Sequence, residues 1–468
     1  MSRLLPCLAV LILTAPAARC AGDARYELGQ RLRAFERAYE TQTDPAARKR
    51  VVPFLKKATP LFFFGRLSEA ARQLDLARLA LESDKEPDAA RRWAGSLVFR
   101  PEARLFDASA EVAPFTLDTF YEVAAEIPEN ARVRLTWCTA DGKPLDGEPS
   151  TVLDVKALPL KDKAPRKNPV AGDYLWRCEV LAGDRVLARW EQTLSFASRL
   201  EGRLERLRKA VGDPADKTVD TDRETARMLA DLLTRLRNKE TLETNYPAAR
   251  LLDEAEAAAD GKPAYGRARP GQFWLKLGLE KGPPFVRLLA PEAAAKGRPL
   301  PLVIALHGAG GSENMFFDGY GDGAIVKLCA RRGWLLVAPR GGLAPGLIDE
   351  IDRLYPVDRK RVFLIGHSMG ASQGAAAASR SPETFAAVAA LSGGGLVRPS
   401  DALKVVPFFV AAGAEDFGLI GSRGLRDDLQ KAGVKKLVYH ELPDVEHLLS
   451  VQATLKDVFA FFDQAAME

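Results

Sequence analysis

The sequence is poor in the residues from which metal and redox sites are built. Its 468 residues include five cysteines and four histidines, and no two cysteines have a CxxC spacing. This scarcity argues against a structural zinc site. Charge of one sign is not concentrated either, because 67 Lys and Arg face 62 Asp and Glu, and the excess of +5 is spread along the chain. Nucleic-acid binding therefore receives no support.

Long apolar runs are also missing. Near the start, Arg3 precedes a short apolar run, Leu4–Leu13, and small residues follow it. A run of this length is too short to span a bilayer, and its flanks are typical of a signal peptide. We expect a signal peptide over residues 1–20, an exported protein (secreted or periplasmic) and no stable membrane span. Arg19 argues against a lipid anchor on Cys20, where a small preceding residue is needed.

Periodicity divides the rest of the chain into modules. Apolar residues recur at helical spacing over residues 23–95 and 198–260, where we expect a helical packing module and a solvated helical linker. Residues 96–197 alternate with a period of two and contain glycine turns, as in a small Ig-like β-sandwich. None of these modules contains a residue set that indicates chemistry. A composition of 47% apolar and 28% charged residues over this length predicts about three domains.

Two cysteines in the sandwich region raise the question of a disulfide. Alternation places Cys138 on the face opposite Trp137, and Cys178 on the same face as Trp176. A disulfide needs side chains that point at each other, so we expect two free thiols, one buried and one partly exposed. The lysine-rich segment 161–169 is predicted to be a polar loop.

Residues 265–468 have a different texture, in which continuous apolar runs alternate with helical stretches. This pattern predicts an α/β domain whose mostly parallel sheet is buried on both faces. In such sheets the functional site lies at the carboxyl ends of the strands. We expect strands over 273–279, 285–289, 302–306, 335–338, 362–365, 387–391, 408–411 and 437–442.

The strongest motif is Gly366-His-Ser-Met-Gly370, which follows the predicted strand 362–365 and precedes a run of small residues. Glycines at both ends permit a sharp strand-to-helix turn that lifts the hydroxyl of Ser368 into a cleft. The pattern predicts Ser368 as a nucleophile.

A glycine-rich loop, His307-Gly-Ala-Gly-Gly311, follows another strand. Its backbone N–H groups can stabilise an oxyanion together with the N–H of Met369, the residue after the nucleophile. We prefer Ala309 as the second donor, with Gly310 in reserve. No Gly-Lys-Ser/Thr follows, which argues against a phosphate loop. His307 is expected to brace the loop.

A serine nucleophile needs a base, and His440 and His447 are the two histidines after Ser368. His440 lies within the last predicted strand and therefore away from its carboxyl end, where the site is expected. His447 follows that strand and is the predicted base. Its orienting carboxylate should follow the preceding strand, where we choose Asp416 over Glu415. His367 is expected to be structural.

With these residues in hand, the chain from 265 to 468 resembles secreted α/β-hydrolase esterases related to polyhydroxybutyrate depolymerases and to feruloyl and acetylxylan esterases. Prolyl-oligopeptidase-type catalytic domains are similar as well. The stretches that carry the resemblance are 306–314, 337–341 and 357–370. It implies a C-terminal α/β-hydrolase fold, preceded here by the helical and β-sandwich modules, with Ser368, Asp416 and His447 as the catalytic triad. The resemblance does not reach residues 23–260.

The leading hypothesis is an exported serine esterase that acts on a small-molecule or polymer-attached ester through an acyl-enzyme. A serine peptidase of prolyl-oligopeptidase type, with the same triad, is one alternative. The other is a non-catalytic scaffold with a relic hydrolase domain. Because every reacting group is supplied by the protein, no cofactor or metal is implied. The sequence does not indicate an oligomeric state.

The loops around the predicted site are short. About a dozen residues separate Ser392–Gly395 from the strand that follows, too few for a lipase-like cap. We therefore expect an open cleft that favours short acyl or aromatic esters on carbohydrate or other large molecules. The alternative is that the N-terminal modules fold over the cleft.

Overall fold

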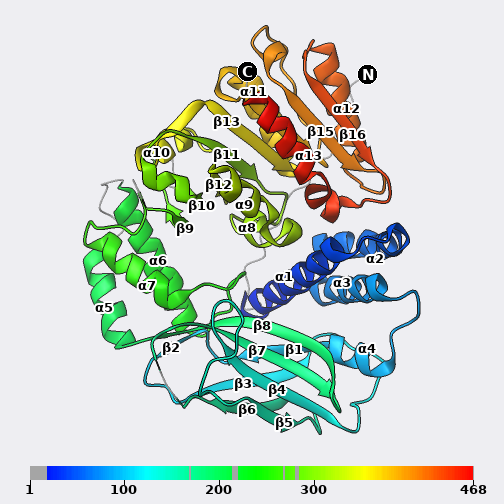
Figure 1. Cartoon of the computed structure of the whole chain (residues 1–468), viewed down its shortest axis with the longest axis vertical. Coiled ribbons are helices and arrows are strands. Elements are labelled where there is room, and N and C mark those ends of the chain that lie inside the picture. The colour runs from blue at the N-terminus through cyan, green and yellow to red at the C-terminus, as the bar shows by residue number, and fades with distance from the viewer. Residues whose placement is uncertain (1–17, 168–169, 213–219, 267–268, 280–283, 467–468) are drawn as a thin grey trace.

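The computed structural model describes residues 18–167, 170–212, 220–266, 269–279 and 284–466 (Figure 1). Residues 1–17, most of the predicted signal peptide, lie outside this range. Within it, no helix combines the length and the apolar character needed to cross a membrane.

The N-terminal part is a bundle of helices. It consists of α1 (Ala18–Thr41), α2 (Pro45–Phe63), α3 (Leu67–Glu82) and the short α4 (Ala89–Gly95). Asp44 starts α2, because its side chain accepts hydrogen bonds from the backbone N–H groups of Ala46 and Ala47. The apolar faces of α1, α2 and α3 pack together, and their shared core extends to Val445 and Leu449 near the other end of the chain.

Two sheets follow and pack face to face. One has the order β1 (Leu97–Pro101), β3 (Val112–Thr119), β6 (Leu160–Pro165), and the other has the order β2 (Leu105–Asp107), β8 (Arg185–Ala197), β7 (Gly172–Ala182), β4 (Ala131–Cys138), β5 (Thr151–Asp154). In their common core Trp137 stacks on Trp176, with ring centroids 5.1 Å apart. The loop predicted over 161–169 is partly wrong, because edge strand β6 pairs with β3 over residues 160–165. Only Ala164 of this strand is fully buried, so the sequence shows no alternation.

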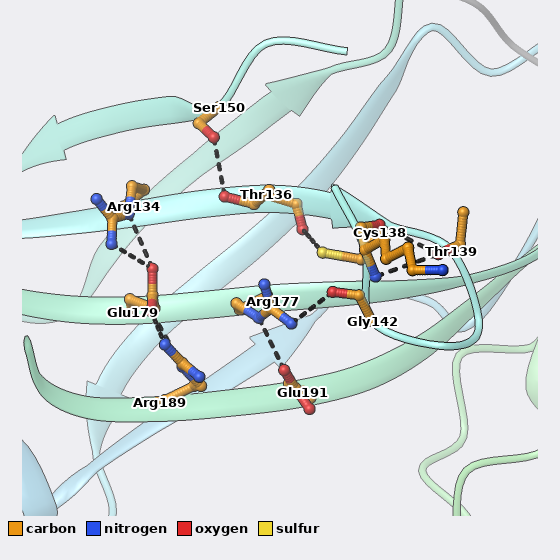
Figure 2. Close-up of polar contacts among 11 residues, drawn as sticks. Arg134, Thr136, Cys138, Thr139, Gly142, Ser150, Arg177, Glu179, Arg189 and Glu191 are labelled. Carbon is orange, nitrogen blue, oxygen red and sulfur yellow. Dashed lines mark hydrogen bonds and ion pairs between the residues drawn. The ribbon is translucent and has the colours of Figure 1, made fainter. Parts of the chain in front are cut away.

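Both sandwich cysteines are free and buried. Trp137 pairs with Trp176 in register, so Cys178 lies on the inner face and Cys138 on the outer face, among the paired charges of the sheet (Figure 2). Their opposite directions agree with two free thiols. The expected partial exposure of one thiol is wrong, because the turn after β4 folds back, pairs through Pro144 with Cys138 and covers it.

The segment expected to be a solvated helical linker is a packed layer of helices. Its helices are α5 (Leu200–Val211), α6 (Thr221–Arg237) and α7 (Ala248–Ala259). Their apolar faces form one core, which includes Trp274 from the next sheet. Thr225 of α6 accepts a hydrogen bond from the backbone N–H of Lys276 at 3.1 Å. The layer therefore fastens the sandwich to the C-terminal domain.

The C-terminal domain is built on an eight-stranded sheet. Its order is β16 (Leu437–Leu442), β15 (Phe408–Gly413), β14 (Ala387–Leu391), β13 (Val357–His367), β11 (Leu300–Leu306), β12 (Leu335–Pro339), β10 (Phe285–Ala290), β9 (Gly271–Lys276). Strands β9 and β10 are antiparallel to their neighbours, and the others run parallel. All eight strands lie at or within a few residues of the predicted positions.

Helices cover both faces of this sheet. One face packs against α10 (Leu347–Leu354), α11 (Met369–Arg380) and α12 (Leu419–Lys431), and the other against α8 (Met315–Asp318), α9 (Tyr320–Arg332) and α13 (Ser450–Ala465). Short 3₁₀ turns occur at Glu292–Lys296, Pro382–Thr384, Leu403–Val405 and His447–Leu449. This is the α/β-hydrolase fold that the sequence predicts. Figure 1 shows α1–α3 lying between this domain and the sandwich.

Candidate active site

Ser368 occupies the turn between β13 and α11. Its φ of 56° and ψ of −115° form a conformation that residues with side chains rarely adopt. The turn closes because two glycines lack side chains. A Cβ at Gly366 would lie 2.2 Å from the carbonyl oxygen of Gly370, and a Cβ at Gly370 would lie 2.0 Å from that of Leu306. The pentapeptide therefore forms the sharp elbow expected of a nucleophile motif.

His447 and Asp416 meet beside this elbow. His447 Nδ1 lies 2.7 Å from Asp416 Oδ1, and both residues are buried. Asp416 also accepts hydrogen bonds from the Gly418 N–H at 2.6 Å and the Ser450 hydroxyl at 3.2 Å. Burial alone would raise the pKa of Asp416, but the hydrogen bond and charge of His447 outweigh it and hold this pKa below its ordinary value. The ionised carboxylate keeps the proton on His447 Nδ1 and leaves Nε2 as an acceptor.

Ser368 and His447 line one cavity of about 190 Å³ together with the loop Gly308–Gly311. A Cβ at Gly308 would lie 3.1 Å from the Cβ of Ser368, so this loop runs directly beside the serine. The predicted oxyanion donors Ala309 and Gly310 both line the cavity. The third, Met369, begins α11, and its backbone N–H belongs to the first turn of that helix. The structure thus places the predicted donors around the serine.

Two residues that the sequence reasoning set aside lie away from Ser368. His440 is exposed on β16, where its ring packs on Phe409 at a centroid distance of 5.2 Å. Glu415 faces α2 and forms an ion pair with Lys56 at 2.9 Å. Asp416, and not Glu415, is therefore the carboxylate that contacts His447.

His307 and His367 are fixed by the backbone around the site. The ring nitrogens of His307 lie 2.8 Å and 2.7 Å from the carbonyl oxygens of Gly308 and Arg340, so its ring joins the glycine loop to the end of β12. His367 receives the Tyr320 hydroxyl at Nδ1 (2.7 Å), and its Nε2–H donates to the carbonyl oxygen of His447 (3.1 Å). Burial, followed by the neighbouring His447, lowers the pKa of His367 to about 3. His367 is thus a neutral support for the backbone of His447.

The expectation of an open cleft is wrong. Helices α1, α2 and α3 cover the site, and the cavity is lined by their residues Leu28, Leu32, Ala58, Thr59, Phe62, Phe63, Ala70 and Leu74. The Phe62 ring contacts the glycine-rich loop so closely that a Cβ at Gly310 would lie 2.6 Å from it. A hydrogen bond also joins the cover to the loop of His447, because Thr59 of α2 donates at 3.0 Å to Glu446, next to His447. The cover comes from the N-terminal helical module, which was the alternative expectation from the sequence. It does not come from an insertion in the C-terminal domain.

Two exposed aromatic side chains, Phe417 and Phe63, lie beside the site, and sequence reasoning missed them. The Phe417 ring lies against the imidazole of His447, with centroids 4.0 Å apart, and Phe63 of α2 meets Phe417 edge-on at 6.4 Å. Phe417 directly follows Asp416, and that position was the only sequence signal for it. Nothing in the sequence of α2 indicated that Phe63 lies near the site.

A buried carboxyl group of α1 contacts Tyr320, which lines the cavity. Glu36 Oε1 accepts a hydrogen bond from the backbone N–H of Tyr320 at 3.1 Å, and Oε2 is buried without a partner. Burial raises the pKa of Glu36 to about 8. Glu36 is therefore connected through Tyr320 and His367 to His447.

Among the described residues, no group of three or more His, Cys, Asp or Glu side chains is arranged to hold a metal ion.

No protein-family model matches the sequence, and no curated protein is similar to it. Solved structures similar to the chain include a ferulic acid esterase, with 17% identity over 42% of this chain and 97% of the other and a TM-score of 0.36. The S-formylglutathione hydrolase of Staphylococcus aureus has 15% identity over 41% of this chain and 98% of its own, with a TM-score of 0.35. A hyperthermophilic esterase from the archaeon Pyrobaculum calidifontis has 18% identity over 43% of this chain and 85% of its own, with a TM-score of 0.32.

Proposed function

We propose that the protein is an exported serine hydrolase that cleaves carboxylic esters. The observation that carries this proposal is the hydrogen bond between Asp416 and His447, beside the Ser368 elbow and in the same cavity. The three residues follow three different strands in the chain order Ser, Asp, His, which is the order used on this fold. Export is supported by the signal-peptide pattern over residues 1–20.

In the proposed mechanism His447 removes the proton of the Ser368 hydroxyl as its oxygen attacks the ester carbonyl. The N–H groups of Met369 and Ala309, or Gly310, stabilise the negative oxygen of the tetrahedral intermediate. His447 then donates its proton to the leaving alcohol, and an acyl-enzyme remains. A water molecule, deprotonated by His447, then attacks the acyl carbonyl, and the bond to the Ser368 oxygen breaks as His447 returns the proton to that oxygen and the acid leaves. No step needs a cofactor.

The cavity favours a small acyl group. Its volume is about 190 Å³, and the side chains that α1, α2 and α3 contribute are largely apolar. An apolar cavity of about 150 Å³ holds benzene. We therefore infer short acyl or aromatic esters as substrates, with the alcohol part free to belong to a carbohydrate or another large molecule. Phe62 forms part of the wall, so Phe62→Ala should raise the KM of an aromatic acyl ester by about tenfold through lost apolar contact, while that of an acetyl ester changes less.

The decisive experiment compares the purified protein on aryl esters and on peptide anilides of matched acyl size. Ester turnover that disappears in Ser368→Ala supports the proposal, and faster turnover of the anilides assigns the site to a peptidase instead. Labelling with a fluorophosphonate separates both enzymes from a scaffold, because only an activated Ser368 reacts.

A further inference from the structure

Two arginines of α1 reach the cavity that contains Ser368. Arg25, Gly29 and Arg33 are spaced four residues apart, so they lie on the same side of α1. Arg33 extends back over this glycine, since a Cβ at Gly29 would lie 3.4 Å from Nη1 of Arg33. Arg25 extends toward the glycine-rich loop 307–311, where its Nη2 would lie 3.9 Å from a Cβ at Gly310. Both arginines thus line the cavity that contains Ser368.

Neither guanidinium has a hydrogen-bond or ion-pair partner in the described part of the chain. Nη2 of Arg33 is buried and lacks any acceptor, an unfavourable state for a charged donor. Arg33 interacts electrostatically with Glu36 on the same helix, but burial raises the pKa of Glu36 to about 8. Burial thus favours the neutral form of this carboxyl, which offsets less of the positive charge of Arg33.

The acidic residues of the cavity are already paired. Glu243 forms an ion pair with Arg340 at 2.6 Å, and Asp318 forms one with Arg287 at 2.7 Å. The remaining walls contributed by α1, α2 and α3 are mostly apolar. An apolar cavity with a catalytic serine and an excess of positive charge is complementary to a substrate with an apolar body and a negative group.

We propose that the ester substrate carries a carboxylate, which Arg25 and Arg33 bind while Ser368 attacks the ester carbonyl. This proposal rests on the proposed esterase function. Guanidinium groups bind carboxylates through paired, charge-assisted hydrogen bonds, and both arginines line the cavity that contains Ser368. The helical module is thereby a specificity element, because it contributes the arginines as well as the apolar wall.

The test uses two matched pairs of esters with the full-length protein. In the first pair, 4-nitrophenyl butyrate and 4-nitrophenyl hemisuccinate differ only by a methyl and a carboxylate at the end of the acyl chain. In the second, 3-methylphenyl acetate and 3-carboxyphenyl acetate place the same difference on the alcohol. The ratio of kcat/KM for the charged over the neutral ester is measured for the wild type, Arg25→Gln, Arg33→Gln and Arg37→Gln. Arg37 is the matched control, because it lies on the exposed side of α1 and pairs with Asp322 at 3.0 Å.

We expect the wild type to prefer the charged ester of one pair by about 10- to 100-fold, the usual strength of hydrogen bonds to a charged group. Either Arg25→Gln or Arg33→Gln should remove most of this preference, Arg37→Gln should keep it, and added salt should weaken it. The pair that shows the preference identifies the side of the ester that bears the carboxylate. Arg25 is exposed, so Arg25→Gln tests the idea even if Arg33→Gln does not fold.

Turnover of the neutral esters with no preference in either pair would overturn the carboxylate proposal and leave the esterase function standing. A preference that persists in both arginine variants would overturn it as well. If the wild type neither hydrolyses any of the esters nor is labelled by the fluorophosphonate, the esterase function itself is refuted.

Discussion

Replacing the buried Glu36 by glutamine should change how the stability of the protein depends on pH. Glu36 lies on α1, and its side chain is completely buried against the start of α9. Burial raises the pKa of Glu36 from 4.5 to about 8. Asp322 adds to this rise, whereas Arg33 and the N–H groups of Tyr320 and Gly321 oppose it. The unfolded chain has the ordinary value, so the folded protein holds the proton more tightly.

The sign follows from this difference. The contribution of Glu36 to folding is fully present below pH 4.5 and is lost as the pH rises toward about 8. At about 1.4 kcal/mol per pKa unit, the loss amounts to roughly 3–4 kcal/mol between pH 5 and pH 8. Glu36→Gln has no proton to lose, keeps an oxygen for the Tyr320 N–H, and should escape this loss.

The assay is urea-induced unfolding at pH 5, 6, 7 and 8, followed by circular dichroism. The free energy of unfolding of Glu36→Gln, relative to the wild type, should rise steadily over this range by roughly the amount above. Glu40→Gln is the control, because Glu40 lies on the exposed side of the same helix and should give no such trend. A constant difference between Glu36→Gln and the wild type at all four pH values would show that Glu36 ionises normally in the folded protein and would refute the reasoning.

The remaining predictions concern the candidate triad. Ser368→Ala and His447→Ala should each reduce ester turnover by roughly 10⁶-fold, the loss seen when a triad member is removed, whereas His440→Ala should retain most activity because His440 lies on the exposed edge strand. Equal damage from His440→Ala in a folded protein would contradict the assignment of the base. Asp416→Asn should lower kcat by about 10⁴-fold, since it loses the charge that orients His447, while Glu415→Gln should be mild because it breaks only the exposed ion pair with Lys56. The reverse order of the two effects would move the orienting role to Glu415.

The hydrolase sheet was predictable because its strands are short, continuous apolar runs bounded by loops, such as Ala387–Leu391 and Phe408–Gly413. The positions of Ser368, Asp416 and His447 followed from the rule that active sites gather at the ends of such strands. The cover over the site was not predictable from the sequence. The apolar stripe of α1 shows that one face is buried but does not identify its neighbour, and Phe62 carries no signal that distinguishes a pocket wall from an ordinary core residue. Edge strand β6 was missed for a related reason, because most of its side chains are exposed.

The cover over the site also has a consequence for how the protein folds during its synthesis. Thr59 and Glu446, which hold α2 to the loop of His447, are 387 positions apart in the chain. The helical module therefore leaves the ribosome long before the loop of His447 is synthesised. During this time the apolar face of the module lacks the residues against which it packs in the final structure. Contacts of such long separation form late and slowly, and the surfaces that await them are prone to aggregation. A chain interrupted before the last strand therefore lacks His447 and the residues near it on which the helices that line the cavity pack.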